Sequence, residues 1–337
     1  MLGVRVPVRE AEKVRRELHR KGLIARGYRI KRMNDVVLIP VEERARRELL
    51  NYELVEAEFE PLRRRRSFEE ILKEKLTPEE LALVKRSFDI IGDIAVVEVP
   101  PELEHRKRDI ALALMEAHKN VRAVFRKAGE VGGTTRVRRL EHLAGDRRTE
   151  TLHREHGLRL KLDIAKVYFS PRLAYERQRI LEQVRDGEVV VDLFAGVGPF
   201  SLLIARHRLV KVYAIDINPE AVRYLKENIA LNRLRGEVIP LSGNSRQVAP
   251  RGVATRVIMN LPTRSDAYLG LAFEVLRSEG GVVHYYTVAP EESLQDKVEL
   301  ASRVAERAGR KVEVLERRIV RTYSPRKYHV ALDLRVF

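Results

Sequence analysis

From about residue 170 onward, short apolar segments alternate with amphipathic ones in a regular order. The apolar segments EVVVDLF, KVYAIDI, GEVIPL, RVIMNLP and GGVVHYY have the length of strands, and stretches such as PEAVRYLKENIALN between them have helical periodicity. Strands that alternate with helices form parallel sheets covered on both faces. We therefore predict an α/β domain over residues 166–337, with a doubly wound, mostly parallel sheet. Its ligand should lie at the carboxyl ends of the first strands.

Two smaller regions precede this domain. Residues 1–62 begin with the alternating pattern Val4-Val6-Val8 and a helical segment that ends near Gly22, so we expect a small N-terminal α/β domain. The run PLRRRRS at 61–67 is typical of an exposed linker. Residues 63–165 predict a middle α+β domain, which contains the capping box TPEE at 77–80 and a cation-rich stretch from Gly129 to about Lys161.

The charge of the chain indicates a polyanionic partner. The 337 residues include 65 Lys and Arg against 49 Asp and Glu, which gives a net charge of +16 and a pI near 10.1. A basic surface neutralises phosphates and releases counterions. We therefore favour a nucleic acid partner over the alternative that the chain is basic without binding a polyanion.

Other features restrict compartment and cofactor. The N-terminus becomes charged within a few residues and no apolar run could cross a bilayer, so we expect a cytoplasmic protein without a membrane partner. The chain has no cysteine, which excludes disulfides and thiolate metal sites, and its nine histidines are scattered, so no metal site is predicted. The absence of Cys and Trp also fits a thermophile.

The clearest motif is VVVDLFAGVGPF at 189–200. An apolar strand ends in Asp192, and Gly196 and Gly198 follow in a turn where missing side chains let the backbone approach a ligand. A dinucleotide fingerprint would place a third glycine at position 201, which is Ser201, so a nicotinamide dehydrogenase is disfavoured. The next strand ends in Asp216, which is placed to accept hydrogen bonds from both ribose hydroxyls of an adenosine.

Two amides follow the third and fourth strands of this pattern. Asn244 lies where an adenine edge would be bound. Asn260, in the sequence Asn260-Leu261-Pro262, offers both a donor and an acceptor to a neutral base edge, while Pro262 fixes the backbone. Taken alone, Asn260 is better explained as a cap before a turn.

The whole chain resembles a known family. The segments that carry the resemblance are RVRRLEHLAGDRRTETLHREHG, KVYFSPRLAYERQRI, VDLFAGVGPFSLLIA, IDINPEAVRYLKENIALN, VIMNLP and HYY. They are similar, in the same order, to the archaeal and eukaryotic tRNA (guanine-N1)-methyltransferases that modify guanosine 37. The resemblance implies a class I Rossmann-type methyltransferase domain, S-adenosyl-L-methionine as cofactor, and a monomer that contacts the anticodon loop and outer corner of tRNA.

The resemblance also assigns roles to residues. Guanine N1 carries a proton, so the site needs a base at N1 and a cation near O6. By resemblance, Glu176 is the base, Arg136 is the cation and Asn260 holds the guanine edge. Substrate contacts are expected from Tyr168, Arg172 and Arg138. Cofactor contacts are expected from Asp192, Phe194, Gly196, Gly198, Asp216, Ile217, Asn244, Asn260 and Pro262.

Three alternatives stay open. The related transferase of wyosine biosynthesis moves an aminocarboxypropyl group from the same cofactor, but its family generally lacks the Asn-Leu-Pro motif that this chain retains. Methylation of another RNA base is the second alternative, because pocket shape and neighbouring loops set base identity. A non-catalytic RNA-binding protein on the same fold is the third, and the intact glycine turn and Asp216 argue against it.

Overall fold

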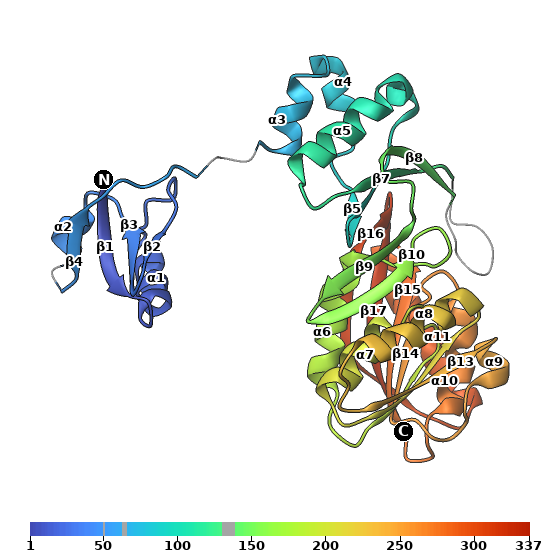
Figure 1. Cartoon of the computed structure of the whole chain (residues 1–337). Helices are drawn as coiled ribbons and strands as arrows, with labels where there is room; N and C mark the ends of the chain where they lie inside the picture. Colours follow the sequence, from blue (N-terminus) through green and yellow to red (C-terminus); the bar gives the residue numbers. More distant parts are fainter. Residues whose placement is uncertain (50, 63–65, 130–138) are drawn as a thin grey trace. The chain divides into compact units, whose positions relative to one another are not determined.

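The computed structural model describes residues 1–49, 51–62, 66–129 and 139–337 of the chain. By their internal contacts these residues form two compact units, Met1–Ser67 and Phe68–Phe337. Figure 1 draws the first unit in blue and the second in colours from cyan to red. No helix in the described ranges is both long enough and apolar enough to cross a membrane.

The first unit is an antiparallel sheet with two short helices. Its elements are β1 (Leu2–Pro7), α1 (Ala11–Arg20), β2 (Lys31–Met33), β3 (Val36–Pro40), α2 (Ala45–Glu48) and β4 (Glu53–Glu56). The strand order is β2-β3-β1-β4. Val4 and Val6 are buried and Arg5 between them is exposed, as expected of a strand with one face on the core. The predicted helix ends before Gly22, whose φ of +67° is left-handed.

The second unit begins with a small mixed sheet and its helices. The elements are α3 (Phe68–Lys73), α4 (Pro78–Leu83), β5 (Asp89–Ile91), β6 (Ile94–Val97), the 3₁₀ helix η1 (Pro101–Arg106), α5 (Lys107–Ala117), β7 (Ala123–Lys127) and β8 (Leu140–Gly145). The strand order is β5-β6-β7-β8, with β6 and β7 parallel. The predicted capping box is confirmed: Thr77 Oγ1 accepts from the Glu80 N–H, and a Glu80 carboxylate oxygen accepts from the Thr77 N–H.

A hairpin, β9 (Glu150–Glu155) and β10 (Leu158–Asp163), connects this region to the large sheet. Leu158 and Leu160 of β10 share a core with helices of the following domain. Asn228 closes the contact from helix α8 (Pro219–Leu231), accepting from the Lys161 N–H at 2.7 Å and donating to the Lys161 carbonyl at 3.0 Å. The hairpin, which the sequence placed in the middle domain, therefore packs directly on the helices of the large sheet.

The large sheet has seven strands in the order β13-β12-β11-β14-β15-β17-β16. Its remaining elements are η2 (Pro171–Leu173), α6 (Ala174–Gln183), β11 (Val189–Asp192), α7 (Pro199–His207), β12 (Lys211–Asp216), β13 (Glu237–Ser242), α9 (Ser245–Val248), β14 (Arg256–Met259), η3 (Ser265–Tyr268), α10 (Leu269–Val275), β15 (Gly281–Ala289), η4 (Glu291–Ser293), α11 (Leu294–Arg307), β16 (Val312–Ser324) and β17 (Lys327–Val336). Strands β13 to β15 are parallel, and β17 and β16 continue the sheet antiparallel.

Helices cover both faces of this sheet (Figure 1). One core joins the sheet to α6, α7 and α8, and another joins the opposite face to α10 and α11. The predicted doubly wound, mostly parallel sheet is confirmed. The carboxyl ends of β11, β12, β13 and β14 therefore meet at one edge, and this edge carries most of the predicted site residues.

Candidate active site

The glycine turn directly follows strand β11. Gly196 and Gly198 both have left-handed backbone angles, with φ of +56° and +88°. A side-chain carbon on Gly198 would lie 2.3 Å from Leu225 of α8, so only glycine fits between the turn and that helix. A side-chain carbon on Gly196 would meet only the Tyr168 carbonyl, at 3.7 Å. The first glycine is therefore open to a ligand, and the second is required by packing.

Asp216 ties the end of β12 to this turn. Its Oδ2 accepts from the Gly196 N–H at 2.7 Å and its Oδ1 from the Asn218 N–H at 2.9 Å. Burial raises the pKa of Asp216, and these backbone donors oppose the shift. A carboxylate has about four acceptor positions, so two remain for ribose hydroxyls. Asn218 caps α8, because its side chain accepts from the Glu220 N–H at 3.1 Å.

Asp192 lies beneath the turn. Its side chain is fully buried, and Oδ2 accepts from Ser201 Oγ at 2.9 Å. The Phe194 N–H lies 3.4 Å from Oδ1. Burial raises the pKa of Asp192 to about 7. Asp192 thus contributes by shaping the turn from inside the protein, and Ser201, at the position where a dinucleotide site would have glycine, is its partner.

Beyond Asp216, the edge of the sheet carries one capping asparagine and several apolar side chains. Asn244 caps the short helix α9, because its Oδ1 accepts from the Arg246 N–H at 3.1 Å. Phe194 packs edge-on against Tyr268, with ring centroids 4.9 Å apart. Ile217, directly after Asp216, is 45% exposed although its side chain is large and apolar. Phe194 and Ile217 provide apolar surface of the kind that covers a nucleobase.

Asn260 follows β14 with an unused acceptor. Its Oδ1 is buried and has no hydrogen-bond partner among the described residues. The loop that continues through Pro262 is anchored by Asp266, which accepts from Tyr285 Oη at 2.5 Å and from Thr287 Oγ1 at 2.9 Å and pairs with Lys297 at 2.5 Å. A buried amide oxygen without a partner costs free energy unless a ligand satisfies it. The Asn260 amide oxygen is therefore placed to accept a hydrogen bond from a ligand.

Tyr168 and Arg172 precede helix α6. The Tyr168 carbonyl lies beside Gly196, so this residue borders the glycine turn. Arg172 Nε lies 2.6 Å from Asp89 of β5 in an ion pair, and its side chain is 41% exposed. Arg172 thus links β5 of the small mixed sheet to η2.

Glu176 lies in the first turn of α6, and its side chain is 2% exposed. Its Oε2 accepts from Tyr286 Oη at 2.9 Å and from Arg179 Nε at 3.0 Å. Tyr286 follows Tyr285, which pairs with Met259, and Asn260 is the residue after Met259. Glu176 therefore faces the strand next to Asn260, at the same edge of the sheet.

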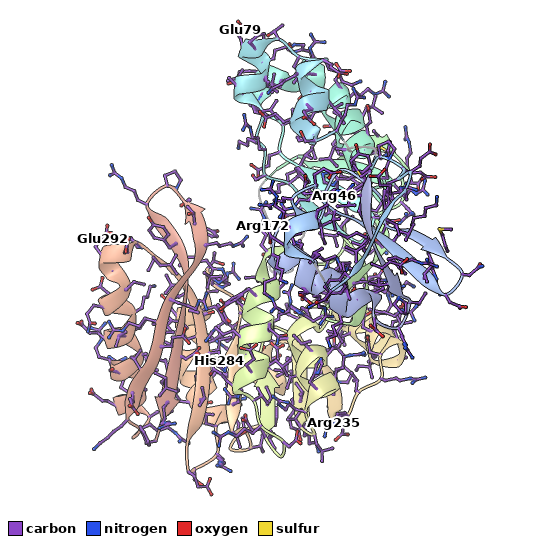
Figure 2. All side chains as sticks on the ribbon, turned by 90° about the vertical axis from the view of Figure 1, so that its left-hand side faces the viewer. Arg46, Glu79, Arg172, Arg235, His284 and Glu292 are labelled. Atoms are coloured by element: carbon purple, nitrogen blue, oxygen red, sulfur yellow. The ribbon has the colours of Figure 1, made fainter. Side chains whose placement is uncertain are left out.

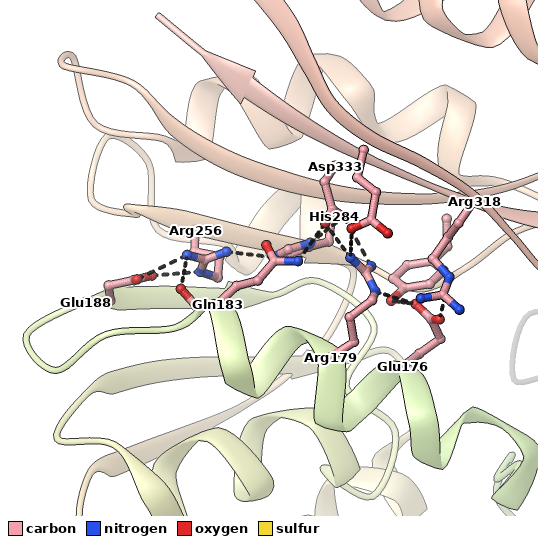
Figure 3. A network of polar contacts seen from close by, with 10 residues as sticks. Glu176, Arg179, Gln183, Glu188, Arg256, His284, Arg318 and Asp333 are labelled. Carbon is pink, nitrogen blue, oxygen red and sulfur yellow. Dashed lines mark hydrogen bonds and ion pairs between the residues drawn. The ribbon is translucent and has the colours of Figure 1, made fainter.

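A buried polar network extends from Glu176 along α6 (Figure 3). Arg179 contacts Asp333, which also bonds His284 Nδ1 at 2.7 Å, and His284 Nε2 lies 2.8 Å from Arg256. Figure 2 shows His284 between the strands of the sheet and helix α6. Burial lowers the pKa of His284. Burial works in the opposite sense on Asp333, but the contacts with His284 and Arg179 outweigh it and keep the pKa of this carboxyl far below its usual range.

Arg136 and Arg138 lie outside the described residues. The hairpin β9–β10 borders a hollow of about 820 Å³, with Arg148, Arg154, Arg159 and Lys161 among its lining residues. Arg148 is paired with Asp93 and Lys161 with Glu150. Arg154 and Arg159 have no side-chain partner among the residues that the structure describes, so they are available to a polyanion.

Sequence reasoning missed several residues of the site. Ser201, Tyr286, Arg179 and Asp266 each bind a predicted site residue or its loop, but the sequence assigns a role to none of them. Tyr286 stands in the segment HYY, and its contact with Glu176 spans 110 residues of sequence. Ser201 had a signal, because it replaces the third glycine of a dinucleotide turn. Within the described ranges, no three His, Asp or Glu side chains are grouped so that they could hold a metal ion.

Comparisons with known proteins identify the family. The model of the TRM5/TYW2 methyltransferase domain matches residues 151–315, the TYW2 N-terminal domain 68–149, and the tRNA methyltransferase 5 N-terminal domain 3–49. The tRNA (guanine(37)-N(1))-methyltransferase Trm5b of Pyrococcus abyssi is 46% identical, over 99% of both chains. The chain belongs to the TRM5/TYW2 methyltransferase family. Another Trm5b, from Methanocaldococcus jannaschii, is 40% identical over 99% of this chain and 98% of that protein.

Solved structures of the TRM5/TYW2 family share the fold. The crystal structure of Pyrococcus abyssi Trm5b has a TM-score of 0.75 and covers 100% of this chain and 99% of its own. A complex of aTrm5 with tRNALeu has a TM-score of 0.73 at 38% identity, with 99% of both chains covered. A family member with a different activity, an aminocarboxypropyltransferase of Pyrococcus horikoshii, is 35% identical over 80% of this chain and 95% of that protein.

Proposed function

We propose that the chain transfers the methyl group of S-adenosyl-L-methionine to N1 of guanosine 37 in tRNA. The likeness to two guanine-37-N1 methyltransferases over 99% of the chain carries this proposal. The glycine turn, Asp216, Asn260 and Glu176 all lie at one edge of the sheet, where this reaction needs them. Similarity to relatives from thermophilic archaea also fits the composition of the chain.

The residues at this edge fit the cofactor. Asp216 keeps acceptor positions for ribose hydroxyls, Gly196 is open to a close ligand, and Phe194 and Ile217 offer apolar surface beside them. Asn244, Asn260 and Pro262 complete the proposed contacts, while Asp192 and Gly198 hold the shape of the turn. Bound S-adenosyl-L-methionine supplies a methyl group on an activated sulfonium, so the protein mainly has to align the nucleophile.

Glu176 is the proposed base. Guanine N1 becomes nucleophilic as its proton leaves, and Glu176 Oε1 is the oxygen that has no hydrogen-bond donor among the described residues. Charge that develops on O6 requires a cation, and Arg136 is proposed for it. Asn260 would bind the guanine edge with its unpaired Oδ1, and Tyr168, Arg172 and Arg138 are proposed contacts of the flipped nucleotide.

The tRNA would be bound by all three proposed domains. Residues 1–62 are assigned to the outer corner of the tRNA, 63–165 to RNA contacts through basic loops, and 166–337 to the anticodon loop and the reaction. The net charge of +16 supports a polyanionic substrate, as do Arg154 and Arg159, which have no side-chain partner within the described part of the chain. We also propose that the enzyme works as a cytoplasmic monomer.

The likeness to aminocarboxypropyltransferases favours a second candidate, transfer of the aminocarboxypropyl group of the same cofactor. Two observations favour methylation over it. The aminocarboxypropyltransferases of Pyrococcus horikoshii and Methanocaldococcus jannaschii match 80% and 72% of the chain, whereas the two Trm5b relatives match 99%. The chain also retains Asn260 and Pro262, in the motif that the aminocarboxypropyl subgroup generally lacks.

The decisive test is nucleoside mass spectrometry of two tRNA transcripts, one with guanosine and one with adenosine at position 37, after incubation with protein and cofactor. We expect N1-methylguanosine from the guanosine transcript alone. A methyl group on another base would refute the proposed substrate. A larger cofactor-derived adduct on a wyosine precursor would support the second candidate, and failure to bind the cofactor would favour a non-catalytic RNA-binding protein.

A further inference from the structure

The three strands at the antiparallel end of the sheet place side chains in rows beneath α6. Tyr286, Ala331 and Arg318 form one row, since Tyr286 pairs with Ala331 and Ala331 with Arg318. Val288, His329 and Arg321 form the next row. Residues paired in this way point to the same face of a sheet. Because Tyr286 and Arg318 both contact Glu176 of α6, Arg318 and Arg321 both lie on the α6 face.

We propose that Arg318 and Arg321 form a phosphodiester-binding site beside Glu176, and that Arg318 covers this carboxylate only until the RNA backbone draws it away. The proposal rests on the methyltransferase function proposed above. It makes Arg318 and Arg321 positioning residues for the target nucleotide. It also makes the Arg318–Glu176 contact a feature of the RNA-free protein.

The contact between Arg318 and Glu176 is incomplete. Arg318 Nε lies 3.2 Å from Glu176 Oε1, within ion-pair range, yet neither atom has a hydrogen-bond partner among the described residues (Figure 3). The attraction is therefore ionic without a well-directed hydrogen bond. Arg179, by contrast, makes a 3.0 Å hydrogen bond to the other oxygen. Arg179 therefore holds the Glu176 carboxylate in place, whereas Arg318 only covers its Oε1.

Arg318 is also freer to move than Arg179. Its side chain is 28% exposed, compared with 9% for Arg179. The Arg318 guanidinium lies over the ring of Tyr175, 4.8 Å from the centroid, and Tyr175 is 65% exposed. A cation–π contact at an exposed site is worth only about 0.5–1 kcal/mol, so this contact restrains Arg318 weakly. Arg179 is fixed, because it also contacts Asp333 and Glu316.

Arg321 supplies the second cation. It has no ion pair or hydrogen bond with any residue that the structure describes, and its Nε is buried without a partner. Burial of an unpaired guanidinium nitrogen costs free energy, which an anionic ligand would recover. Two arginines on one face of a strand match the oxygens of a phosphodiester, and the guanidinium fork is well suited to them.

The charged and titratable side chains near Glu176 come from four elements. Arg179 and Tyr175 belong to the same helix, Tyr286 to β15, and Arg318, Arg321 and Glu316 to β16. From β17, Asp333 contacts Arg179 and the His329 ring lies 5.5 Å from the Tyr286 ring. Of these groups, Arg318 is the cation on Oε1. Its withdrawal leaves Oε1 free to take the proton from guanine N1 while Oε2 stays fixed.

The first experiment compares Arg318→Ala and Arg321→Ala with Arg317→Ala in the full-length protein. Arg317 is the matched control, since it belongs to the same strand but bonds Gln295 of α11 on the other face. We expect the two variants to weaken binding of a guanosine-37 transcript by about 10- to 100-fold. We expect each to reduce the salt dependence of binding by about one charge. Arg317→Ala should change neither, and cofactor affinity should stay the same in all three.

The second experiment uses a transcript with one neutral methylphosphonate, either 5′ or 3′ of guanosine 37. If the arginines bind one of these phosphodiesters, that transcript should lose affinity for the wild-type protein but not for the Arg318→Ala/Arg321→Ala double variant. If each methylphosphonate lowers the affinity of the double variant as much as that of the wild-type protein, the proposed phosphodiester site is refuted. Arg318→Lys should restore part of the affinity, which separates loss of the charge from a folding defect.

The third readout is the pH dependence of the single-turnover rate. If Arg318 stays on Glu176 in the reacting complex, its removal favours the protonated carboxyl, and the acid limb moves to higher pH. If the RNA has drawn Arg318 away, the acid limb of Arg318→Ala coincides with that of the wild type. A shifted limb would refute the displacement of Arg318. Failure of the wild-type protein to form N1-methylguanosine would instead refute the proposed function, and the binding assays would still test the site.

Discussion

Asp216 Oδ2 accepts a 2.7 Å hydrogen bond from the backbone N–H of Gly196, which joins the end of β12 to the glycine turn after β11. The carboxylate that would hold a ribose therefore also fixes the loop that the ligand approaches. Its other oxygen is bound by the Asn218 N–H at the start of α8. One side chain thus sets the geometry of two neighbouring strand ends.

Asp216→Ala should mainly weaken cofactor binding. The change removes a charged acceptor of ribose and loosens the turn, and hydrogen bonds to a charged group are worth about 1.5–3 kcal/mol. We expect the Kd for S-adenosyl-L-methionine to rise by about 10- to 100-fold, measured by equilibrium dialysis. Glu237→Ala is the control, because Glu237 begins β13 at the end of the sheet away from the glycine turn, and its affinity for S-adenosyl-L-methionine should be unchanged. Unchanged affinity in Asp216→Ala would disprove the ribose contact.

Glu176→Gln should affect the reaction instead of cofactor binding. Glutamine cannot accept the N1 proton as a carboxylate does, and general base catalysis contributes about 10²- to 10⁴-fold. The single-turnover rate should fall by that order while the Kd of the cofactor changes little. Glu182→Gln, on the exposed side of the same helix, controls for removal of one charge. Equal losses of cofactor affinity in Glu176→Gln and Asp216→Ala would contradict the separate roles.

Local sequence signals predicted the parts of this edge that short segments define. The strand that ends at Asp192 and the turn at Gly196 and Gly198 follow from residues within one short segment, as does the capping box at Thr77 and Glu80. Such features depend on backbone angles and nearby hydrogen bonds, which a sequence encodes directly. The doubly wound sheet follows equally from the spacing of apolar segments.

Contacts between distant segments could not be predicted in the same way. Glu176 meets Tyr286 and Arg318 because β15, β17 and β16 extend the sheet antiparallel beneath α6, and their register is a property of the folded sheet. The pairing of Arg172 with Asp89 likewise requires the small mixed sheet to lie against η2. A sequence motif can identify Glu176 as a candidate site residue, but the side chains that bind its carboxylate can be identified only from the folded structure.

Asp192→Asn should stabilise the protein increasingly as pH rises. The pKa of Asp192 is about 7 in the folded protein against an ordinary value of 3.8, so the folded state binds the extra proton between these values. Stability of the wild type should therefore fall as pH increases from about 4 to 7, and level off above. The asparagine variant avoids this loss, which is on the order of 4 kcal/mol because the pKa differs by about 3 units and one unit corresponds to about 1.4 kcal/mol.

Chemical denaturation at pH 5 and pH 8 tests this prediction. Asparagine can keep both contacts, accepting from the Phe194 N–H and donating to Ser201 Oγ. The stability difference between variant and wild type should be larger at pH 8 than at pH 5. Asp296→Asn, on an exposed position of α11, should show the same stability difference at both pH values. A difference for Asp192→Asn that does not depend on pH would show that the folded protein holds this carboxyl ionised throughout.

Asp266→Asn should loosen the loop that carries Asn260 and Pro262. Burial alone would raise the pKa of Asp266, but its contacts with Lys297, Tyr285 and Thr287 outweigh burial and lower it. The ionised form therefore stabilises the fold above the unfolded-state pKa, near 4, and this contribution disappears as pH falls through the lower folded-state value. At pH 7 we expect a loss of about 1–2 kcal/mol, allowing for partial exposure of the pair.

Function should respond through the loop as well. With Asp266→Asn, Asn260 is held less firmly, so both cofactor affinity and the single-turnover rate should fall by about tenfold, less than in variants of Asn260 itself. Asp296→Asn serves again as the control. If denaturation shows the expected loss of stability while cofactor affinity and rate stay at wild-type values, then Asp266 stabilises the fold without positioning Asn260.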